Sequence, residues 1–367
     1  MKKFKVGLIG VGGIATWAHL PSLTHMDNIE VVAFADINEE TLKTRAEQYN
    51  IKNTFTDYKK LLEMDEIDAV HVLTPNKVHM QPTIDALEAG KHVICEKPIA
   101  RTVAEATKMK EASERTGKKL MIAQNYRFTN QAQCLKRFID TDVLGEIYFA
   151  RVWALRRRGI PGWGVFTDKE QQGGGPLIDI GVHALDLTLY LMGNPKPVTT
   201  SGMAVAKIGN TPGHVGLLGS WDHTKFTVED YAAGFVRFED GRSLILESSF
   251  AANIEHEELI RSNLLGTKAG AEIDGAPWDT EDNLKIYGER CGSLTNGKVF
   301  GFADSFTYPP EYAKFYSYRN ECMAFYKAIE EDTEVPVTPE HAINCLRILE
   351  GIYRSEEAGR EIKLDEF

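Results

Sequence analysis

The sequence predicts two domains of different fold class: an N-terminal α/β domain with a doubly wound parallel sheet, and a C-terminal α+β domain with a mainly antiparallel sheet. The chain has 367 residues, about twice the usual size of one domain. Up to about residue 125, short apolar runs alternate with helical patterns, the order that parallel βαβ units produce. Beyond that point the strands lengthen and helices become fewer, which is typical of an α+β domain.

In the first domain, apolar runs predict strands and the segments between them predict helices. Strands are expected at residues 5–10, 29–36, 68–74, 91–96 and 119–124. Helices are expected at residues 14–25, 78–89 and 103–116, with Gly90 and Gly117 at helix C-caps. Doubly wound sheets bind ligands at the carboxyl ends of their strands. Residues that directly follow these strands are therefore the first candidates for a functional site.

The second domain is expected to hold longer strands and three helices. The strands are predicted at residues 147–155, 198–206, 231–238 and 243–250, the last two joined by the hairpin signal Glu239-Asp240-Gly241. The helices are predicted at residues 176–192, 318–331 and 339–359. We place the boundary after Gln124, which gives domains 1–124 and 125–367. The closing helix can pack back on the first domain.

Charge and composition exclude several classes of protein. Lys plus Arg total 42 and Asp plus Glu 53, a net charge of −11, so the chain has no general attraction for nucleic acids or anionic membranes. Hydrophobic residues at 43% and charged residues at 26% exclude a disordered chain. The glycines of residues 7–13 argue against a secretory signal. The five scattered cysteines contain no Cys-x-x-Cys pair, so we expect a cytoplasmic protein without a metal site.

A dinucleotide site is predicted at the end of the first strand. Gly10-Val11-Gly12-Gly13-Ile14-Ala15 fits G-x-G-x-x-G/A between a strand and a helix, where backbone N–H groups approach a pyrophosphate. Asp36 ends the second strand, where a carboxylate accepts hydrogen bonds from the ribose hydroxyls and disfavours a 2′-phosphate. We therefore expect NAD rather than NADP. The alternative interpretation is a glycine turn with an Asp that caps a helix.

Two further corners lie at the same edge of the predicted sheet. Thr74-Pro75-Asn76 either faces the nicotinamide half of the cofactor or forms a plain turn, and His79 is interpreted as structural or cofactor-adjacent. Glu96-Lys97-Pro98 follows the next strand, so Lys97 emerges beside the expected nicotinamide. There a lysine can serve as an acid, a base or an alkoxide-stabilising group. The alternative is a solvated surface lysine.

The second domain supplies a carboxylate and an imidazole. Asp179 and His183 are four residues apart on the predicted helix that follows Gly173-Gly174-Gly175, so they share one face. The three glycines allow close backbone approach to a ligand or cofactor. In a cleft, Asp179 can hold a substrate hydroxyl while His183 takes or returns its proton. Two interpretations compete: a buried structural histidine, or a metal-binding pair that lacks an obvious third ligand. Asp186 either orients His183 or is a surface carboxylate.

In their order along the chain, these motifs resemble those of the glucose–fructose oxidoreductase and inositol dehydrogenase family (Gfo/Idh/MocA). The shared motifs include Asn125-Tyr126-Arg127-Phe128 and the closing Gly359-Arg360-Glu361-Ile362, so the resemblance is nearly full length. It implies a Rossmann domain, a second domain with an open-faced sheet, and homo-oligomers, often dimers or tetramers. It also implies oxidation of a secondary hydroxyl of a sugar, polyol or glycoside with NAD, or reduction of the matching ketone. Lys97, Asp179 and His183 match the family's catalytic set.

The resemblance leaves the substrate and two other functions open. Tyr126 and Arg127 at the domain junction either contact substrate or brace Glu96. Further candidate substrate contacts are Arg156, Arg157 or Arg158 for a carboxylate or phosphate, and Trp163 for a sugar face. The arginines are equally consistent with a basic surface turn or a subunit contact. The alternatives to a dehydrogenase are an NAD-assisted glycoside hydrolase of the same family and a dinucleotide-sensing protein without turnover.

Overall fold

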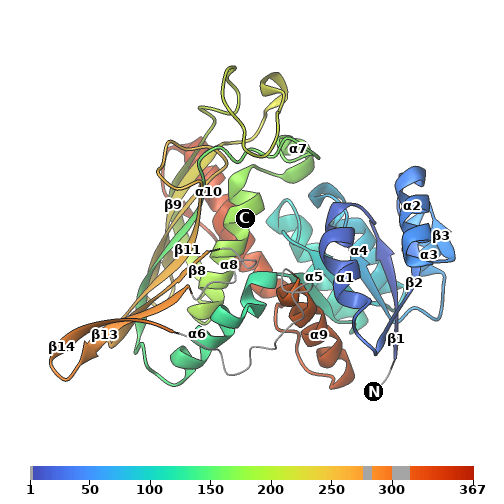
Figure 1. The fold of residues 1–367 in the computed structure, drawn as a ribbon, viewed down its shortest axis with the longest axis horizontal. Helices are drawn as coiled ribbons and strands as arrows, with labels where there is room; N and C mark the ends of the chain where they lie inside the picture. Colours follow the sequence, from blue (N-terminus) through green and yellow to red (C-terminus); the bar gives the residue numbers. More distant parts are fainter. Residues whose placement is uncertain (1–2, 276–282, 300–314) are drawn as a thin grey trace. The chain divides into compact units, whose positions relative to one another are not determined.

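The computed structural model describes residues 3–275, 283–299 and 315–367, which form two compact units (Figure 1). The first unit comprises residues 1–125 and 314–343, and the second comprises residues 126–313 and 344–367. The first crossing lies between Asn125 and Tyr126, one residue from the predicted boundary. The chain then returns to the first unit at residues 314–343. We expected a return only for the closing helix, 339–359. None of the described helices has the length and apolarity needed to cross a bilayer.

The first unit is built on a six-stranded parallel sheet with the order β3-β2-β1-β4-β5-β6. The five predicted strands correspond to β1 (Phe4–Ile9), β2 (Ile29–Ala35), β4 (Ala69–Val72), β5 (His92–Glu96) and β6 (Leu120–Ala123). β1 lies between β2 and β4, so the strand order reverses direction beside it. The predicted doubly wound α/β fold is therefore confirmed, and β1 marks the point where such sheets bind ligands.

The helices of this unit follow the caps that the sequence provides. The predicted helix 103–116 is observed as α5 (Val103–Thr116), with Thr102 as N-cap and Gly117 in the left-handed conformation as C-cap. The predicted helix 78–89 is observed as α4 (Met80–Glu88) after a short 3₁₀ turn. The predicted helix 14–25 is instead a π-helical turn, Ala15–His19, followed by α1 (Leu20–Leu23).

Three elements of the first unit were not predicted. These are α2 (Glu39–Tyr49), β3 (Asn53–Phe55) and α3 (Tyr58–Leu62). Within α2 only Leu42 is buried, so the helix carries little apolar periodicity for a pattern to detect. Strand β3 has three residues and lies at the edge of the sheet. Weak burial explains why the sequence pattern is weak here.

The second unit contains a nine-stranded sheet with the order β14-β13-β12-β11-β7-β10-β9-β8-β15. Neighbouring strands run antiparallel except for β7 and β10, which are parallel. The predicted strands are β7 (Ile147–Arg156), β8 (Pro197–Val205), β9 (Tyr231–Phe238) and β10 (Ser243–Ser249). The sheet is completed by strands that were not predicted, namely β11 (Glu258–Gly266), β12 (Ala269–Asp274), β13 (Leu284–Arg290), β14 (Ser293–Lys298) and β15 (Ile362–Lys363). The mainly antiparallel α+β class is confirmed.

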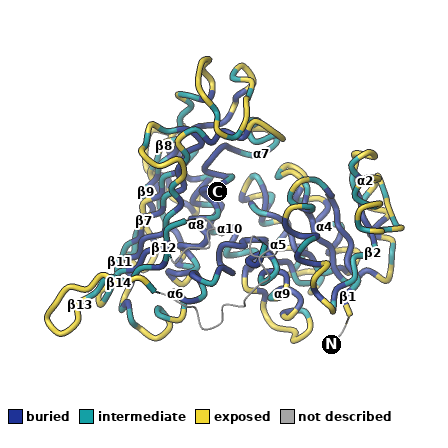
Figure 2. Tube along the Cα trace, viewed as in Figure 1, coloured by how far each residue is buried: buried dark blue, intermediate teal, exposed yellow. Residues whose placement is uncertain are grey.

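Helices pack on this sheet and carry most of the remaining buried residues. They are α6 (Asn130–Asp140), α7 (Lys169–Gln172) and α8 (Val182–Leu191), the last preceded by a second π-helical turn at Leu177–Gly181. The predicted closing helices are α9 (Tyr316–Glu330), which lies in the first unit, and α10 (Pro339–Ala358). Figure 2 shows the hairpin of β13 and β14 as a largely exposed extension, whereas strand β9 alternates buried and less buried residues.

Candidate active site

The glycine loop after β1 has one crowded side and one open side. Gly10 has φ +88°, and a Cβ there would lie 2.8 Å from the Leu73 carbonyl oxygen, so glycine is required at this position. Cβ atoms at Gly12 and Gly13 would meet no described atom within 4 Å. The loop leads into the π-helical turn Ala15–His19. The two open glycines therefore leave the backbone accessible to a ligand at the start of a helical segment.

Asp36 is bound to the glycine loop. Its Oδ2 accepts a hydrogen bond from the Val11 backbone N–H at 2.8 Å, and its Oδ1 accepts one from the Asn38 N–H at 2.9 Å. The next helix, α2, has Glu39 and Glu40 in its first turn. Three carboxylates therefore gather close to the end of β2, and they make the region unfavourable for an additional negative charge.

His79 connects the loops that follow β4 and β5. Its Nδ1 lies 2.8 Å from the Pro98 carbonyl oxygen and its Nε2 lies 2.7 Å from the Thr74 carbonyl oxygen. Carbonyl oxygens only accept, so a neutral ring can donate to one of them. Complete burial is the main influence on His79 and lowers its pKa, which favours that neutral form. The structure thus places His79 between the two predicted corners.

Two polar atoms at the same sheet edge have no hydrogen-bond partner within the described part of the chain. They are the buried Thr74 Oγ1, after β4, and the buried Gln124 Oε1, directly after β6. Buried polar atoms are normally paired. These two atoms therefore offer hydrogen-bonding capacity to a ligand at the carboxyl ends of the strands.

Glu96 and Lys97 stand at the end of β5. The Glu96 side chain is buried, with Oε1 2.8 Å from His19 Nε2, and Oε2 accepts the Lys97 backbone N–H at 3.0 Å. Burial opposes ionisation of Glu96, but the hydrogen bond from His19 and the positive charge of Lys97 lower its pKa below the ordinary value. Lys97 itself is half-buried, which differs from a fully solvated surface lysine.

In the second unit, Asp179 lies in the π-helical turn and His183 in the first turn of α8. Both are half-buried, whereas their neighbours from Leu177 to Val182 are otherwise buried. The regular four-residue helical spacing that we predicted is therefore interrupted by the wider π turn. The ring of Tyr126 stacks on the His183 ring with centroids 4.5 Å apart and planes at 15°, so that one face of the imidazole is covered.

The glycines ahead of this helix pack tightly within the second unit. A Cβ at Gly174 would lie 2.0 Å from the Tyr353 hydroxyl oxygen, and one at Gly175 would lie 2.3 Å from the Glu229 carbonyl oxygen. We predicted that these glycines allow backbone approach to a ligand. The structure gives Gly174 and Gly175 a different reason, which is close packing against the protein's own residues.

Glu229 holds this glycine segment in place. Its carboxylate accepts hydrogen bonds from the backbone N–H groups of Gly175 at 2.9 Å and Leu177 at 3.1 Å, and from the Tyr353 hydroxyl at 2.8 Å. Burial raises the pKa of Glu229, and the three donors oppose this shift without cancelling it. The sequence analysis did not identify Glu229 or Tyr353, because their partners lie 54 and 124 residues away along the chain.

Arg127 and Asp186 form a buried ion pair. The Arg127 Nε and one terminal nitrogen bind the two Asp186 oxygens at 2.7 and 2.6 Å, and the side chains are 2% and 1% exposed. Of our two interpretations of Asp186, the surface carboxylate is wrong, because its side chain is buried. The pair joins the segment of Tyr126 to helix α8, which carries His183.

The predicted substrate segment has two arginines with partners in their own unit. Arg156 Nε binds Glu258 at 2.7 Å, and the Arg158 terminal nitrogens bind the Ala252 carbonyl oxygen at 3.2 Å and Asn253 Oδ1 at 2.7 Å. Arg157 is exposed. Trp163 is 57% exposed and makes an edge contact with Phe166, so its indole face is available to a ligand.

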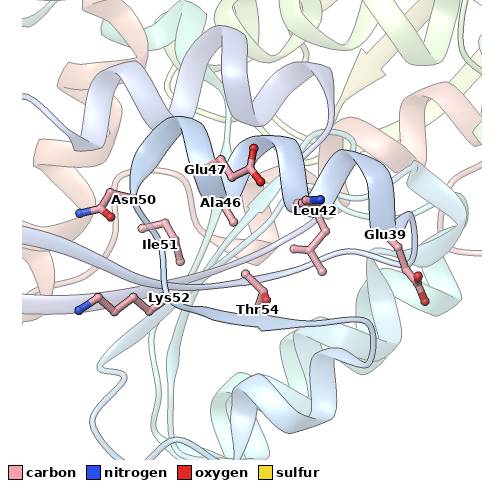
Figure 3. Close-up of a pocket in the computed structure, with 9 residues that line it drawn as sticks. Glu39, Leu42, Ala46, Glu47, Asn50, Ile51, Lys52 and Thr54 are labelled. Carbon is pink, nitrogen blue, oxygen red and sulfur yellow. The ribbon is translucent and has the colours of Figure 1, made fainter.

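A surface hollow of about 380 Å³ lies beside α2 and the edge strand β3, and Figure 3 shows residues that line it. Its lining includes Glu39, Leu42, Glu47, Ile51 and Thr54. No predicted site residue lines this hollow, and its position at the edge of the sheet differs from the carboxyl ends of the central strands. We therefore do not assign the predicted chemistry to it.

Models of known protein families match almost the whole chain. Residues 4–124 match a model of an oxidoreductase family with an NAD-binding Rossmann fold (GFO_IDH_MocA), and residues 136–364 match the C-terminal α/β domain of the same family. A D-glucoside 3-dehydrogenase of Escherichia coli K12 is 39% identical over 282 residues, 77% of this chain and 80% of that protein. A scyllo-inositol 2-dehydrogenase (NADP+) of Bacillus subtilis 168 is 28% identical, covering 98% of this chain and 96% of that protein.

The fold also matches solved structures. A levoglucosan dehydrogenase in complex with NADH and L-sorbose has a TM-score of 0.86 at 24% identity, with 99% of each chain covered. At this identity the match shows the shared fold.

Proposed function

The chain belongs to the Gfo/Idh/MocA oxidoreductase family, and from this premise we propose that it is an NAD-dependent dehydrogenase. Its reaction oxidises a secondary hydroxyl of a sugar, polyol or glycoside, or reduces the matching ketone. The observation that carries this proposal is that the side chains of Lys97, Asp179 and His183 are each half-buried. Lys97 follows the end of strand β5, and Asp179 and His183 lie in the mostly buried helical segment that leads into α8. Groups in this state keep access to a ligand while the surrounding protein restricts their orientation.

The residues of the first unit fit a dinucleotide. The open backbone at Gly12 and Gly13 suits a pyrophosphate, and the unpartnered Thr74 Oγ1 and Gln124 Oε1 suit a polar ring at the strand ends. Ile14 continues the loop as N-cap of the π-helical turn. Pro75, Asn76 and His79 complete the corner after β4. NAD supplies the hydride acceptor when it is bound.

We assign NAD rather than NADP on electrostatic grounds. The 2′-phosphate of NADP would add negative charge beside Asp36, where Glu39 and Glu40 already lie in the first turn of α2. The residues directly after Asp36 are Ile37 and Asn38, which offer no cation. A relative that is 28% identical to this chain is named as an NADP+ enzyme, so the preference for NAD over NADP needs a direct test.

In the proposed reaction, His183, Asp179 and Lys97 have separate roles in proton transfer and in binding the substrate oxygen. His183 accepts the proton of the substrate O–H group as the electron pair of the adjacent C–H bond departs with the hydride, which leaves a ketone. Asp179 accepts a hydrogen bond from a substrate hydroxyl and orients it. Lys97 stabilises the developing alkoxide or exchanges a proton with it. Tyr126, stacked on His183, limits the orientations of the imidazole.

We further propose that the substrate is a neutral sugar or glycoside. Arg156 is neutralised by Glu258 and Arg158 is bound to a carbonyl and an amide oxygen, so neither needs an acidic substrate to complete its contacts. The exposed indole of Trp163 suits the apolar face of a sugar ring. The name of the relative that is 39% identical, a D-glucoside 3-dehydrogenase, agrees with a neutral glycoside.

We also propose a cytoplasmic homo-oligomer, either a dimer or a tetramer. The five cysteines form no disulfide in the structure, which suits a reducing compartment. In the nine-stranded sheet, Met203 on β8 and Ile245 on β10 are 41% and 38% exposed. Strand β9 lies between these two strands, and its half-buried Phe235 pairs with Ile245. Such an apolar sheet face is suited to contact a second copy of the chain. Light scattering on the purified protein measures the assembly.

The deciding experiment incubates the protein with NAD and a panel of methyl glucosides, inositols, glucuronate and glucose 6-phosphate, and follows NADH absorbance and bond cleavage in parallel. We expect net NADH with a neutral compound. Lys97→Ala should lower turnover by at least about a hundredfold with NAD affinity retained, whereas Lys108→Ala, an exposed lysine of α5 in the same unit, should leave it unchanged. Cleavage without net NADH would contradict the proposal, and so would near-normal turnover of Lys97→Ala.

A further inference from the structure

Four side chains of the first unit form a continuous buried chain that the proposed mechanism does not use. Tyr326 Oη lies 2.7 Å from His71 Nε2, His71 Nδ1 lies 3.0 Å from His19 Nδ1, and His19 Nε2 lies 2.8 Å from Glu96 Oε1. The two histidines are 0% exposed, Tyr326 is 1% exposed and Glu96 is 6% exposed. They come from α9, β4, the first π-helical turn and β5. The chain ends beside Lys97, whose N–H binds the second Glu96 oxygen.

Each polar atom in this chain has one partner, so the protons can be assigned. Hydrogen bonds and nearby positive charge keep Glu96 ionised and lower its pKa despite its burial, so its oxygen only accepts and His19 Nε2 carries a hydrogen. A neutral His19 then accepts at Nδ1. His71 must therefore carry its hydrogen on Nδ1, and its Nε2 must accept the Tyr326 hydroxyl proton. Burial lowers the pKa of His71 and raises that of Tyr326, which agrees with a neutral ring and a protonated phenol.

We propose that His19, His71 and Tyr326 are positioning residues that hold the Glu96 carboxylate, and through it the backbone of Lys97, with the two histidines in opposite neutral tautomers. All hydrogen bonds then run in one direction, from the Tyr326 hydroxyl to Glu96. The role of Lys97 in this inference rests on the proposed function. The proton arrangement does not, because it follows from the contacts together with the neutral state of His19 that we propose.

A metal ion is the main competing explanation for this cluster. His19, His71 and the buried Cys322 each offer a ligand atom, and these atoms lie within 4.8 Å of one another. However, two nitrogens at about 2.0 Å from a tetrahedral metal are about 3.3 Å apart. The observed Nδ1–Nδ1 distance of 3.0 Å fits an N–H···N hydrogen bond instead. The hydrogen-bonded chain also uses all four histidine nitrogens, so we prefer it.

The test has a spectroscopic arm that needs no activity. Long-range ¹H–¹⁵N spectra of ¹⁵N-histidine-labelled protein distinguish Nδ1–H, Nε2–H and doubly protonated rings. We expect one neutral Nδ1–H ring whose signals move in Tyr326→Phe, which identifies it as His71, and an Nε2–H ring for His19. A doubly protonated His19, or an Nε2–H ring responding to Tyr326→Phe, would overturn the arrangement. So would loss of these N–H signals with one equivalent of Zn²⁺ and a thiolate-to-cobalt band with Co²⁺, which would establish a metal site.

The kinetic arm compares two tyrosines that each donate a hydroxyl hydrogen bond in the first unit. Tyr326→Phe should lower kcat about fivefold, the worth of one net hydrogen bond, with the KM for substrate and NAD within about twofold. Tyr58→Phe removes the hydroxyl bound to Asp85 at 2.7 Å and should leave kcat unchanged. Equal kcat values for the two variants would defeat the positioning role. A wild-type protein without dehydrogenase activity would defeat the proposed function, while the tautomer spectra would still decide the chain.

Discussion

Removing one partner of the buried Arg127–Asp186 pair should destabilise the second unit strongly. Asp186→Asn keeps the size of the side chain but replaces an accepting oxygen with an NH₂ group that faces the guanidinium. The side chains are 2% and 1% exposed, and both contacts are 2.7 Å or shorter. One charge-assisted hydrogen bond of about 1.5–3 kcal/mol is lost. The guanidinium charge also stays buried after its carboxylate partner is removed, and broken pairs of this kind cost about 3–5 kcal/mol.

Urea unfolding followed by tryptophan fluorescence measures this effect, because Trp153, Trp163 and Trp221 lie in the second unit. With a slope of about 2–3 kcal/mol per molar urea, the midpoint should fall by about 1–2 M. Glu350→Gln is the matched control. It breaks the more exposed pair of Glu350 with Arg354, whose side chains are 17% and 43% exposed, and it should cost less than about 1 kcal/mol.

A double variant separates the burial of charge from loss of packing. Arg127→Met with Asp186→Leu removes both charges at similar volume and should recover most of the lost stability. The reasoning fails if Asp186→Asn shifts the midpoint no more than Glu350→Gln does. It fails equally if the double variant is less stable than Asp186→Asn, because the buried guanidinium charge would then not be the main cost.

Three further predictions concern the cofactor loop and pH. Gly10→Ala should lower the unfolding free energy by at least about 1 kcal/mol, because Gly10 has a positive φ and its Cβ would meet the Leu73 carbonyl. Gly13→Ala adds a Cβ that meets no described atom. It should therefore keep the same stability in the urea titration but weaken NAD binding. In calorimetric titrations NAD should bind at least about tenfold more tightly than NADP, and Asp36→Ser should remove most of that preference; equal affinities in the wild type would refute the role of Asp36. Burial raises the pKa of Glu229 above 4.5, so the unfolding free energy should fall as pH rises from 4.5 through the raised pKa, and Glu229→Gln should flatten that slope.

The fold could be predicted where side-chain patterns and caps are local. Strand β9 (Tyr231–Phe238) alternates buried and less buried residues, and α5 is bounded by Thr102 and Gly117, so both were located to the residue. Strand β14 (Ser293–Lys298) is exposed along its whole length and carries no pattern of burial to detect. The π-helical turn at Leu177–Gly181 reads in sequence like any other helical turn.

The site could be predicted only as far as its motifs extend along the chain. The glycine loop, Lys97 and His183 each belong to a short motif with a recognisable strand or helix beside it. The supporting contacts, by contrast, join residues that are distant in sequence: Asp186 lies 59 residues from Arg127, and Tyr326 lies 255 residues from His71. Such pairs exist because the fold brings distant segments together, and a single sequence contains no local signal for them.

The return of residues 314–343 to the first unit affects how the protein is synthesised. Tyr326 packs its ring 5.2 Å from Phe4, the Val337 carbonyl accepts a hydrogen bond from Ile122, and Ser317 binds Asn125. None of these contacts can form when the ribosome has completed only residue 125. The remaining 218 residues up to Ile343 (343 − 125) take about 10–40 s at bacterial-type translation rates of about 5–20 residues per second. During that interval the nascent sheet lacks helix α9, whose Tyr326 contacts β1 and β4, so this sheet is completed only after most of the second unit has been synthesised.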